Sequence, residues 1–132
     1  MVLGLDLGTT NVKALVADAE GRPVSRGSCP VQLFRLGDGG VEQDIEDIWG
    51  ATLTAIGQAL KTVKASAIQA IGVCSQGGAM QMIRPDGQPA GRVISWLDQR
   101  GRPFDDALNA ELGRGWFVQR IVHGGSGLCI GQ

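Results

Sequence analysis

The sequence offers little material for a metal centre or a disulfide framework. It contains a single histidine, His123, and three cysteines, Cys29, Cys74 and Cys129, with no Cys-x-x-Cys pair among them. A zinc site needs more ligands at closer spacing, and an odd number of distant cysteines is typical of proteins from a reducing compartment. We therefore expect the three thiols to act as small core residues.

Charge imbalance and long apolar runs are also missing. The 12 basic and 13 acidic side chains leave a formal net charge of -1, which gives no electrostatic reason to expect a nucleic acid or an anionic membrane as partner. No run approaches the roughly 20 apolar residues of a membrane span. The N-terminus carries no basic segment of the kind that opens a signal peptide. These absences predict a soluble cytoplasmic protein.

Glycine, in contrast, is abundant. The chain has 21 glycines in 132 residues, about 16%, against a usual share of about 7%. They are scattered among apolar runs without a Gly-X-Y period, which excludes collagen and predicts many tight turns in a folded protein. The length is that of one domain with its own core.

Three extended segments are predicted at the start of the chain. Apolar runs at residues 2–7 and 12–17 flank turn-forming residues 8–11, and residues 23–34 follow a second turn. After a glycine-rich loop, Asp44 has the character of an N-cap, and apolar residues recur at helical spacing to about Lys64. The apolar run at residues 68–74 is typical of a buried parallel strand.

The second half of the chain is predicted to continue with a hairpin and a shorter helix. Residues 79–83 and 92–96 flank the turn Pro85-Asp86-Gly87, and Pro103 begins a helix that runs to Leu112. The order β-β-β-α-β indicates an α/β protein with a mixed sheet, since a helical crossover leads into a parallel strand. The ribonuclease H-like, or actin-like ATPase, domain is one of the few common folds that begin this way.

Residues 6–13, Asp-Leu-Gly-Thr-Thr-Asn-Val-Lys, carry the most chemical information. A carboxylate at the end of a buried strand, Asp6, could hold a magnesium ion directly or through its waters. Gly8 lets backbone N–H groups approach phosphate oxygens, Thr9 and Thr10 add hydroxyls, and Lys13 adds positive charge. The segment differs from a Walker loop, whose GxxxxGK[ST] pattern does not occur in the chain. An ordinary β-hairpin with polar turn residues is the alternative.

Four motifs in the same order make the chain resemble the N-terminal part of an FGGY-type carbohydrate kinase, the family of xylulokinases and glycerol kinases. They cover most of the sequence: Asp6-Leu7-Gly8-Thr9-Thr10, Val41-Glu42-Gln43-Asp44 with Ile48-Trp49, Ile71-Gly72-Val73-Cys74-Ser75-Gln76, and Ile94-Ser95-Trp96-Leu97-Asp98-Gln99-Arg100. The resemblance implies ATP and Mg²⁺ as cofactors. It places Asp6 at the magnesium ion and Gly8, Thr9 and Thr10 at the ATP phosphates, with Lys13 beside them.

The resemblance also implies a sugar or polyol site at the strand that ends in Gln76. Where glycerol kinases have Arg-Glu and xylulokinases have Met-His, this chain has Gly77-Gly78, so a backbone N–H or a water would have to replace a side chain there. Trp96 matches a position beside the substrate, although a core tryptophan on a strand is an equal alternative. Asp98 and Arg100 either close the sugar pocket or form a solvated ion pair at the start of a loop, and we favour the second for Arg100.

The residues that would complete the reaction are missing from the sequence. The family's catalytic base is an aspartate in a Gly-Asp-Gln type motif, which does not occur up to Gln132, and its second phosphate loop and adenine pocket are absent as well. Residues 1–132 are therefore expected to be the N-terminal portion of the kinase's N-terminal domain, inactive alone and incomplete at its C-terminus. Apolar surface near Gln132 should then favour self-association or partial disorder.

Two other hypotheses stay open. A stand-alone module or degenerate kinase would bind a nucleotide, a sugar or a partner protein without catalysis, and the Gly77-Gly78 pair and the missing base favour it slightly. A different actin-like ATPase would share the Asp6 hairpin but would not account for the motifs around Trp49 and Trp96. The coding sequence past Gln132 distinguishes the first of these from a kinase fragment.

Overall fold

The computed structural model describes residues 1–113 and Trp116, and these form parts of two compact units. The first unit comprises Met1–Leu33 and Gln43–Gly77, and the second comprises Phe34–Glu42 with the described part of the chain from Gly78 onward. The apolar surface that we predicted near Gln132 lies outside the described residues.

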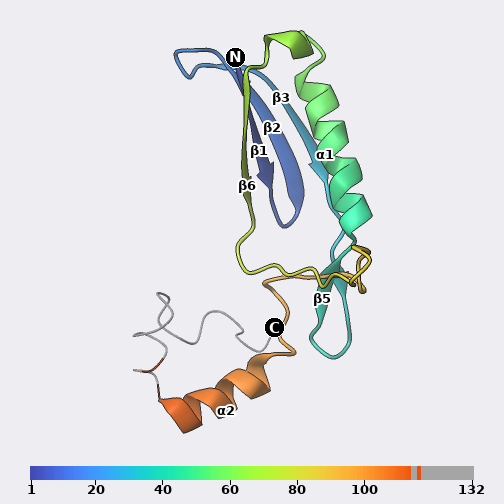
Figure 1. The fold of residues 1–132 in the computed structure, drawn as a ribbon, viewed down its shortest axis with the longest axis vertical. Coiled ribbons are helices and arrows are strands. Elements are labelled where there is room, and N and C mark those ends of the chain that lie inside the picture. Colours follow the sequence, from blue (N-terminus) through green and yellow to red (C-terminus); the bar gives the residue numbers. More distant parts are fainter. Residues whose placement is uncertain (114–115, 117–132) are drawn as a thin grey trace. The chain divides into compact units, whose positions relative to one another are not determined.

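A mixed four-stranded sheet covered by one helix makes up the first unit. Its strands are β1 (Val2–Leu7), β2 (Asn11–Ala17), β3 (Pro23–Pro30) and β6 (Ala70–Ser75), in the order β3-β2-β1-β6. The first three are antiparallel neighbours, whereas β6 runs parallel to β1. The helix α1 (Ile45–Ala59) and a short 3-10 turn (Ala65–Ala67) connect the meander to β6 (Figure 1). The predicted β-β-β-α-β order is confirmed.

The core of the first unit lies between α1 and the sheet. Alternate residues of the strands and small residues of the helix are buried there: Leu3, Leu5, Val12, Ala14, Val16, Ala51, Ala55 and Ala59. At Gly27 on β3 the helix comes so close that a Cβ atom would lie 2.7 Å from Cβ of Gln58 and 2.9 Å from N of Ala59. The glycine therefore sets how closely the helix packs on this strand.

The predicted helix begins where expected and ends early. The Asp44 carboxylate accepts a hydrogen bond of 2.9 Å from N–H of Glu46 and caps the helix, as its sequence position predicted. The end near Lys64 is wrong, because α1 ends at Ala59 and the next bonds are turn-like, such as Val63 N–H to Leu60 O at 3.3 Å. Val63 is still buried, so the apolar period continues through a turn that packs on the same core.

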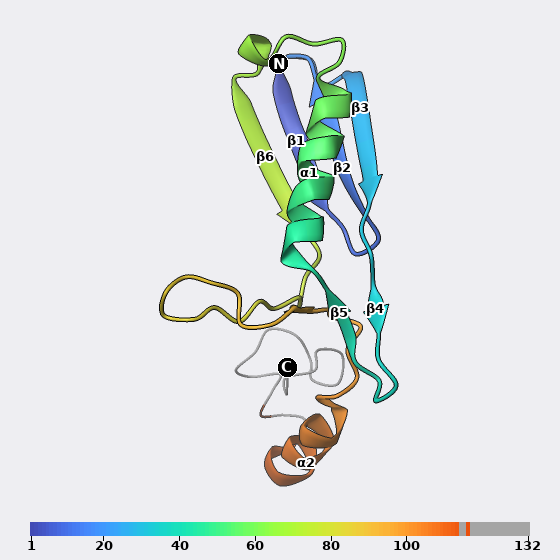
Figure 2. The same cartoon turned by 90° about the vertical axis from the view of Figure 1, so that its right-hand side faces the viewer.

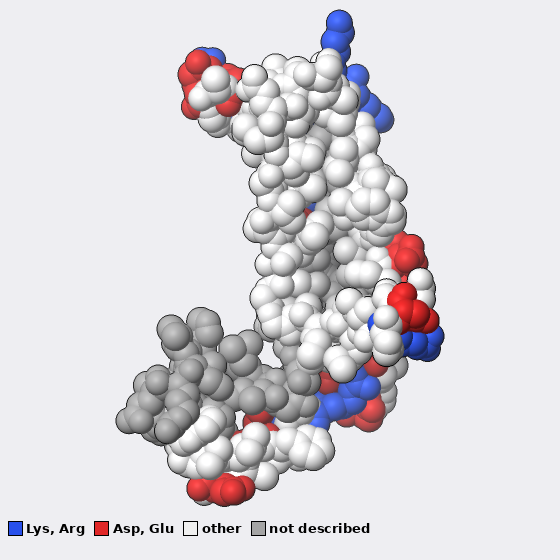
Figure 3. All heavy atoms as spheres, viewed as in Figure 1, with Lys and Arg blue, Asp and Glu red and all other residues white. Residues whose placement is uncertain are grey.

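The parallel direction of β6 is confirmed, but its predicted burial is wrong. All its residues are exposed, including Ile71 at 60% and Val73 at 62%. Helix α1 packs on β2 and β3, and Figure 2 shows β6 at the edge of the sheet beyond the helix. Few charged side chains lie over the strands in Figure 3. The strand thus presents apolar side chains that no described residue covers.

Two further sequence-based expectations are corrected in the first unit. The third extended segment does not run unbroken to Phe34, because β3 ends at Pro30 and Phe34 begins the separate strand β4. The expectation that the thiols are core residues is wrong for Cys74, which is exposed, while Cys29 is half-buried. Cys129 lies outside the described residues.

The second unit is built on a small three-stranded sheet. Its strands are β4 (Phe34–Arg35), β5 (Val41–Gln43, of which Gln43 belongs to the first unit) and β7 (Val93–Ile94), in the order β4-β5-β7. The expected hairpin around Gly87 is present as antiparallel bridges, one of which joins Met80 to Ile94. The second helix, α2 (Arg102–Leu112), matches its prediction within one residue. No helix among the described residues is long and apolar enough to cross a membrane.

Candidate functional site

The carboxyl ends of β1 and β6 lie side by side in the first unit (Figure 1). In their parallel register Asp6 is opposite Cys74, and N–H of Gln76 donates to O of Leu7 at 3.0 Å. In open α/β sheets, ligands bind outside the carboxyl ends of the parallel strands. The fold therefore brings the predicted metal ligand, the predicted phosphate hairpin and the predicted polyol residue Gln76 to one edge of the sheet.

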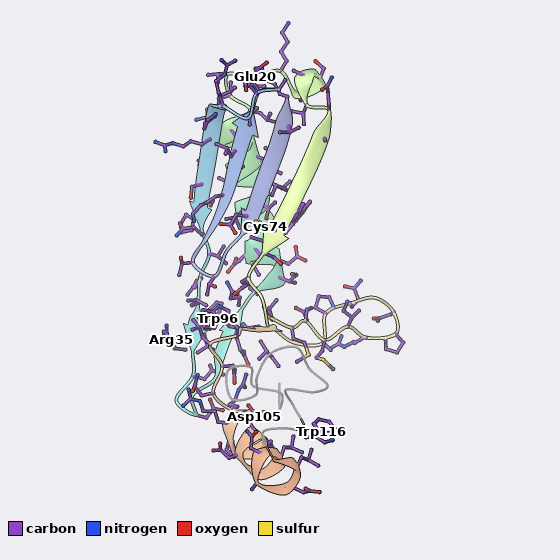
Figure 4. The ribbon with its side chains drawn as sticks, turned by 90° about the vertical axis from the view of Figure 1, so that its left-hand side faces the viewer. Glu20, Arg35, Cys74, Trp96, Asp105 and Trp116 are labelled. Carbon is purple, nitrogen blue, oxygen red and sulfur yellow. The ribbon has the colours of Figure 1, made fainter. Side chains whose placement is uncertain are left out.

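The Asp6 carboxylate is accessible at this edge. Its Oδ2 lies 3.5 Å from Nζ of Lys13 on the neighbouring strand, and both side chains are about half-exposed or more, so the pair adds little stability. The thiol of Cys74, near the end of β6 in Figure 4, donates to O of Leu5 at 3.4 Å and lies 3.7 Å from Oδ1 of Asp6. The carboxylate thus keeps room for a further ligand.

The turn between β1 and β2 is tight. N–H of Gly8 donates to O of Asn11 at 3.2 Å, and a Cβ atom on Gly8 would lie only 2.7 Å from that oxygen. The amide of Asn11 donates to Oγ1 of Thr10 at 3.2 Å. A residue with a side chain could not take the place of Gly8 without moving the turn.

Both carbonyl groups at the tip of this hairpin are held by protein donors. Nε2 of Gln43 donates to O of Thr9 at 3.0 Å, and N–H of Val31 donates to O of Thr10 at 3.0 Å. In a trans peptide the N–H points opposite to the C=O, so the Thr9 contact also fixes the direction of the Thr10 N–H. Such a fixed backbone is what a phosphate cradle requires.

The residues at this edge fit a magnesium ion of the kind that accompanies a nucleotide. No group of three or more His, Cys, Asp or Glu side chains suited to a metal ion occurs in the part of the chain that the structure describes. Mg²⁺ usually binds through one or two carboxylates together with waters and substrate phosphates, not through an all-protein cage. One accessible carboxylate beside a backbone turn that protein donors hold in place meets that description.

A glutamine that the sequence analysis did not single out connects the hairpin to Gln76, the residue that follows β6. Gln43 is fully buried, and its Oε1 accepts a hydrogen bond of 2.6 Å from Nε2 of Gln76. Gln76 was predicted as a substrate-binding residue, but nothing in its own motif revealed this partner. One feature of the sequence does point to Gln43. It is a residue with a long amide side chain directly before the helix cap Asp44, within one of the four motifs that resemble the family.

In the second unit the Asp98 side chain is buried and fully engaged with its own neighbourhood. Its carboxylate accepts hydrogen bonds from N–H of Val41 at 2.9 Å, from N–H of Arg100 at 2.9 Å and from the Arg100 guanidinium at 2.7 Å. The guanidinium also donates to Glu42 at 2.9 Å. The predicted ion pair exists, but it is not the solvated pair that we expected, because the Asp98 side chain is only 2% exposed.

These contacts shift the pKa values of both Asp98 and Arg100. Burial by itself raises the pKa of the Asp98 carboxyl, but the hydrogen bonds from Arg100 and from the Val41 backbone outweigh it, so the pKa lies below its ordinary value. The hydrogen bonds to Asp98 and Glu42 raise the pKa of the Arg100 guanidinium further above its usual range. Both groups are therefore charged throughout the physiological range.

The remaining predicted substrate residues are divided between the two units. Gln76 and Gly77 belong to the first, whereas Gly78, Trp96 and Asp98 belong to the second. Gly78 has a φ of 75°, a conformation that side-chain-bearing residues rarely adopt. Trp96 follows β7 and is 49% exposed (Figure 4), so the alternative of a core tryptophan on a strand is wrong.

Comparison with known proteins decides the family. The sequence model for the FGGY family of carbohydrate kinases, N-terminal domain, matches residues 1–123. The chain belongs to this family. A glycerol kinase from Rhodospirillum rubrum is 39% identical over 113 residues, which are 83% of this chain and 23% of that protein.

Solved structures of FGGY relatives have the same fold. The structure of a xyloylose kinase from Brucella ovis matches 93% of this chain and 26% of its own, with a TM-score of 0.81 and 30% identity. A gluconate kinase from Lactobacillus acidophilus matches 89% of this chain and 24% of its own, with a TM-score of 0.83 and 22% identity. The predicted ribonuclease H-like, actin-like ATPase fold is confirmed. The chain spans about a quarter of the length of the relatives it matches.

Proposed function

We propose that the complete protein transfers the γ-phosphate of ATP to a hydroxyl group of a small sugar or polyol in the cytoplasm. Residues 1–132 would be the N-terminal portion of its N-terminal domain, carrying a phosphate hairpin and part of the carbohydrate site. Membership of the FGGY family and the named relatives support the reaction class. The nucleotide-binding domain and the catalytic base would lie in a further part of the protein.

One observation carries this proposal most directly. The parallel pairing of β1 with β6 puts Asp6 and the hairpin at residues 8–11 next to Gln76, which follows β6. Phosphoryl transfer is mainly a matter of positioning an acceptor hydroxyl in line with the γ-phosphate and stabilising charge. A phosphate-binding turn and a hydroxyl-binding residue at one sheet edge supply two parts of that arrangement.

Each residue at the edge has a task in the proposed reaction. Mg²⁺, when bound, neutralises charge on the phosphate oxygens. Asp6 would hold the ion directly or through water, as its accessible carboxylate permits. The fixed backbone of Gly8, Thr9 and Thr10 would donate to phosphate oxygens, with the threonine hydroxyls beside it. Lys13, 3.5 Å from Asp6, would add positive charge to the same face.

Each predicted substrate residue would have its own task in carbohydrate binding. Gln76 would bind a hydroxyl, and the glycines that follow it would leave room for the substrate and offer backbone N–H groups. The exposed Trp96 would pack its ring against the carbon skeleton. Asp98 would contribute by fixing the segment after Trp96 through its contacts with Val41 and Arg100.

An ATP-dependent phosphorylation assay over a panel of sugars and polyols tests the proposal. The protein encoded by the complete reading frame should phosphorylate at least one of them and should lose activity on Asp6→Asn, while the exposed-loop control Asp86→Asn keeps it. The 132-residue chain alone should show no turnover. Turnover by the 132-residue chain would overturn the assignment as a partial domain. A reading frame that ends at Gln132, with nucleotide or sugar binding and no turnover, would favour the non-catalytic module.

A further inference from the structure

The two glutamines at the site form a chain of hydrogen bonds that starts at the phosphate hairpin. Nε2 of Gln43 donates to O of Thr9 at 3.0 Å, and Nε2 of Gln76 donates to Oε1 of Gln43 at 2.6 Å. All three residues belong to the first unit, although they come from the hairpin, the end of β5 and the end of β6. These two hydrogen bonds therefore link residues that are far apart in sequence. Thr9 and Gln43 are separated by 34 positions, and Gln43 and Gln76 by 33.

The direction of these bonds follows from the first one. A backbone carbonyl can only accept, so the group of Gln43 that faces Thr9 must be its NH₂. The carbonyl of Gln43 then faces Gln76, which must in turn offer its NH₂. The Thr9 carbonyl thus determines the orientation of both side-chain amides. The side-chain carbonyl of Gln76 is then the last group in the series of hydrogen bonds.

That last oxygen has no protein donor among residues 1–113 and 116. Oε1 of Gln76 is shielded from solvent and accepts no hydrogen bond within them. A buried acceptor without a donor is costly, and such atoms in native proteins call for a specific explanation. Because Gln76 directly follows β6 at the carboxyl edge of the β1–β6 pair, this acceptor lies where a ligand is expected.

We propose that Gln43 is a positioning residue that presents Oε1 of Gln76 as an acceptor for one substrate hydroxyl. The inference rests on the proposed sugar or polyol kinase function and deepens it, since it selects a ligand that donates a hydrogen bond at this point. The backbone of Gln76 is fixed separately through Leu7. Gln43 therefore controls the orientation of the amide without determining where the residue lies.

The same two hydrogen bonds make the backbone position at Thr9 and the orientation of the Gln76 amide depend on each other. Gln43 is fully buried, so water cannot readily replace either of its bonds. Loss of its amide would release the Thr9 carbonyl and would let the Gln76 amide rotate. A side chain that touches no substrate would in this way affect substrate affinity.

Kinetics of the complete kinase provide the main test. Gln43→Met and Gln76→Met each remove an amide at similar volume, and each should raise KM for the sugar or polyol about tenfold, while kcat changes less than about threefold. The double variant should be no worse than Gln76→Met, because Gln43 acts through Gln76. The control Gln58→Met, which removes a contact to Ser28 on β3, should leave both constants unchanged.

Additive effects in the double variant, or an unchanged KM for Gln43→Met, would overturn the proposal. If Gln43→Met does not fold, substrate analogues that lack one hydroxyl replace it. One analogue should then lose affinity for the unmodified kinase and lose none for Gln76→Met. Equal losses for every analogue in both proteins would refute the contact.

Nuclear magnetic resonance on the 132-residue chain separates this inference from the proposed function. The side-chain amide protons of Gln43 and Gln76 should exchange slowly with solvent, and Gln76 should lose this protection in Gln43→Met. If the amide protons behave in this way but the complete protein phosphorylates no sugar or polyol, the hydrogen bonds between the amides exist and the kinase assignment fails. Fast exchange of both amides in the unmodified chain would refute the amide chain itself.

Discussion

The two units of the chain are stabilised by different kinds of interaction. The first has an apolar core, where α1 packs on β2 and β3 and its buried alanines join alternate residues of β1 and β2. The second has a three-stranded sheet of short strands, held at β5 by the buried carboxylate of Asp98 and the guanidinium of Arg100. An apolar core depends on volume and shape, whereas a buried ion pair depends on each single partner. Substitutions should therefore affect the two units in different ways.

The largest effect is expected for Asp98→Ala. It leaves the buried Val41 N–H without its side-chain acceptor, and the half-exposed Arg100 guanidinium keeps its bond to Glu42, so the expected cost is about 3 kcal/mol. Hydrogen exchange at the Val41 amide should speed up by the corresponding factor, while amides of the first unit keep their rates. The exposed Asp106→Ala, on α2, should change the free energy of unfolding by less than about 0.5 kcal/mol. Equal loss in both variants would mean that the buried pair does not stabilise the second unit.

The next effect, in the first unit, comes from Gly27→Ala. The added methyl group would meet Cβ of Gln58 and N of Ala59, and overpacking of this kind costs about 1–3 kcal/mol. Gly50, in α1, has nothing within 4 Å of its hypothetical Cβ, so Gly50→Ala should stabilise the chain by about 0.5–1 kcal/mol. Chemical denaturation measures both. A stabilised Gly27→Ala variant would show that the helix does not approach β3 as closely as described.

Sequence periodicity predicted the first unit well because its stability comes from apolar faces. The alternation along β1 and β2 and the helical spacing after Asp44 reflect burial, and burial is what these patterns report. Two errors have the same origin. Val63 keeps the apolar period after the helix has ended, and the apolar run of β6 is exposed in this chain. An apolar pattern predicts a face suited to burial, not the presence of a neighbour to cover it.

The candidate site was only partly predictable for a related reason. Asp6 and the glycine-threonine turn form a local motif, so their proximity follows from the sequence alone. The bond between Gln43 and Gln76 joins two long amides from distant segments, and no periodicity reports such a pair. The burial of Asp98 was missed because a charged residue in a loop is usually solvated.

The pH dependence of stability should distinguish the units as well. The pKa of Asp98 is lowered in the folded chain, so its contribution is fully present above the ordinary value of 3.8 and is lost as the pH falls through the folded pKa. Unfolding of the second unit should therefore become easier below about pH 4, and Asp98→Asn should remove this dependence.

A matched control for this pH dependence lies in the first unit. The backbone of Arg22, followed by its side chain, lowers the pKa of Asp18, and that Arg22 side chain is 73% exposed. Asp18→Asn should reduce the loss of stability at low pH far less than Asp98→Asn does, since solvent screens the interaction with Arg22. Thermal melts of both variants between pH 2 and pH 6 give the comparison. If Asp98→Asn left the fall in melting temperature at low pH unchanged, the prediction for Asp98 would be wrong.

The smallest effect is predicted for β6, where apolar side chains lie uncovered. Val16, on β2, is fully buried, and Val16→Ala should cost about 1–3 kcal/mol. Val73 is 62% exposed, so Val73→Ala should cost less than about 0.5 kcal/mol when the 132-residue chain is dilute. An equal cost for both variants would mean that another surface covers β6 in solution. If a second copy supplies that surface, the cost of Val73→Ala should rise with protein concentration, because association stabilises the folded chain by mass action.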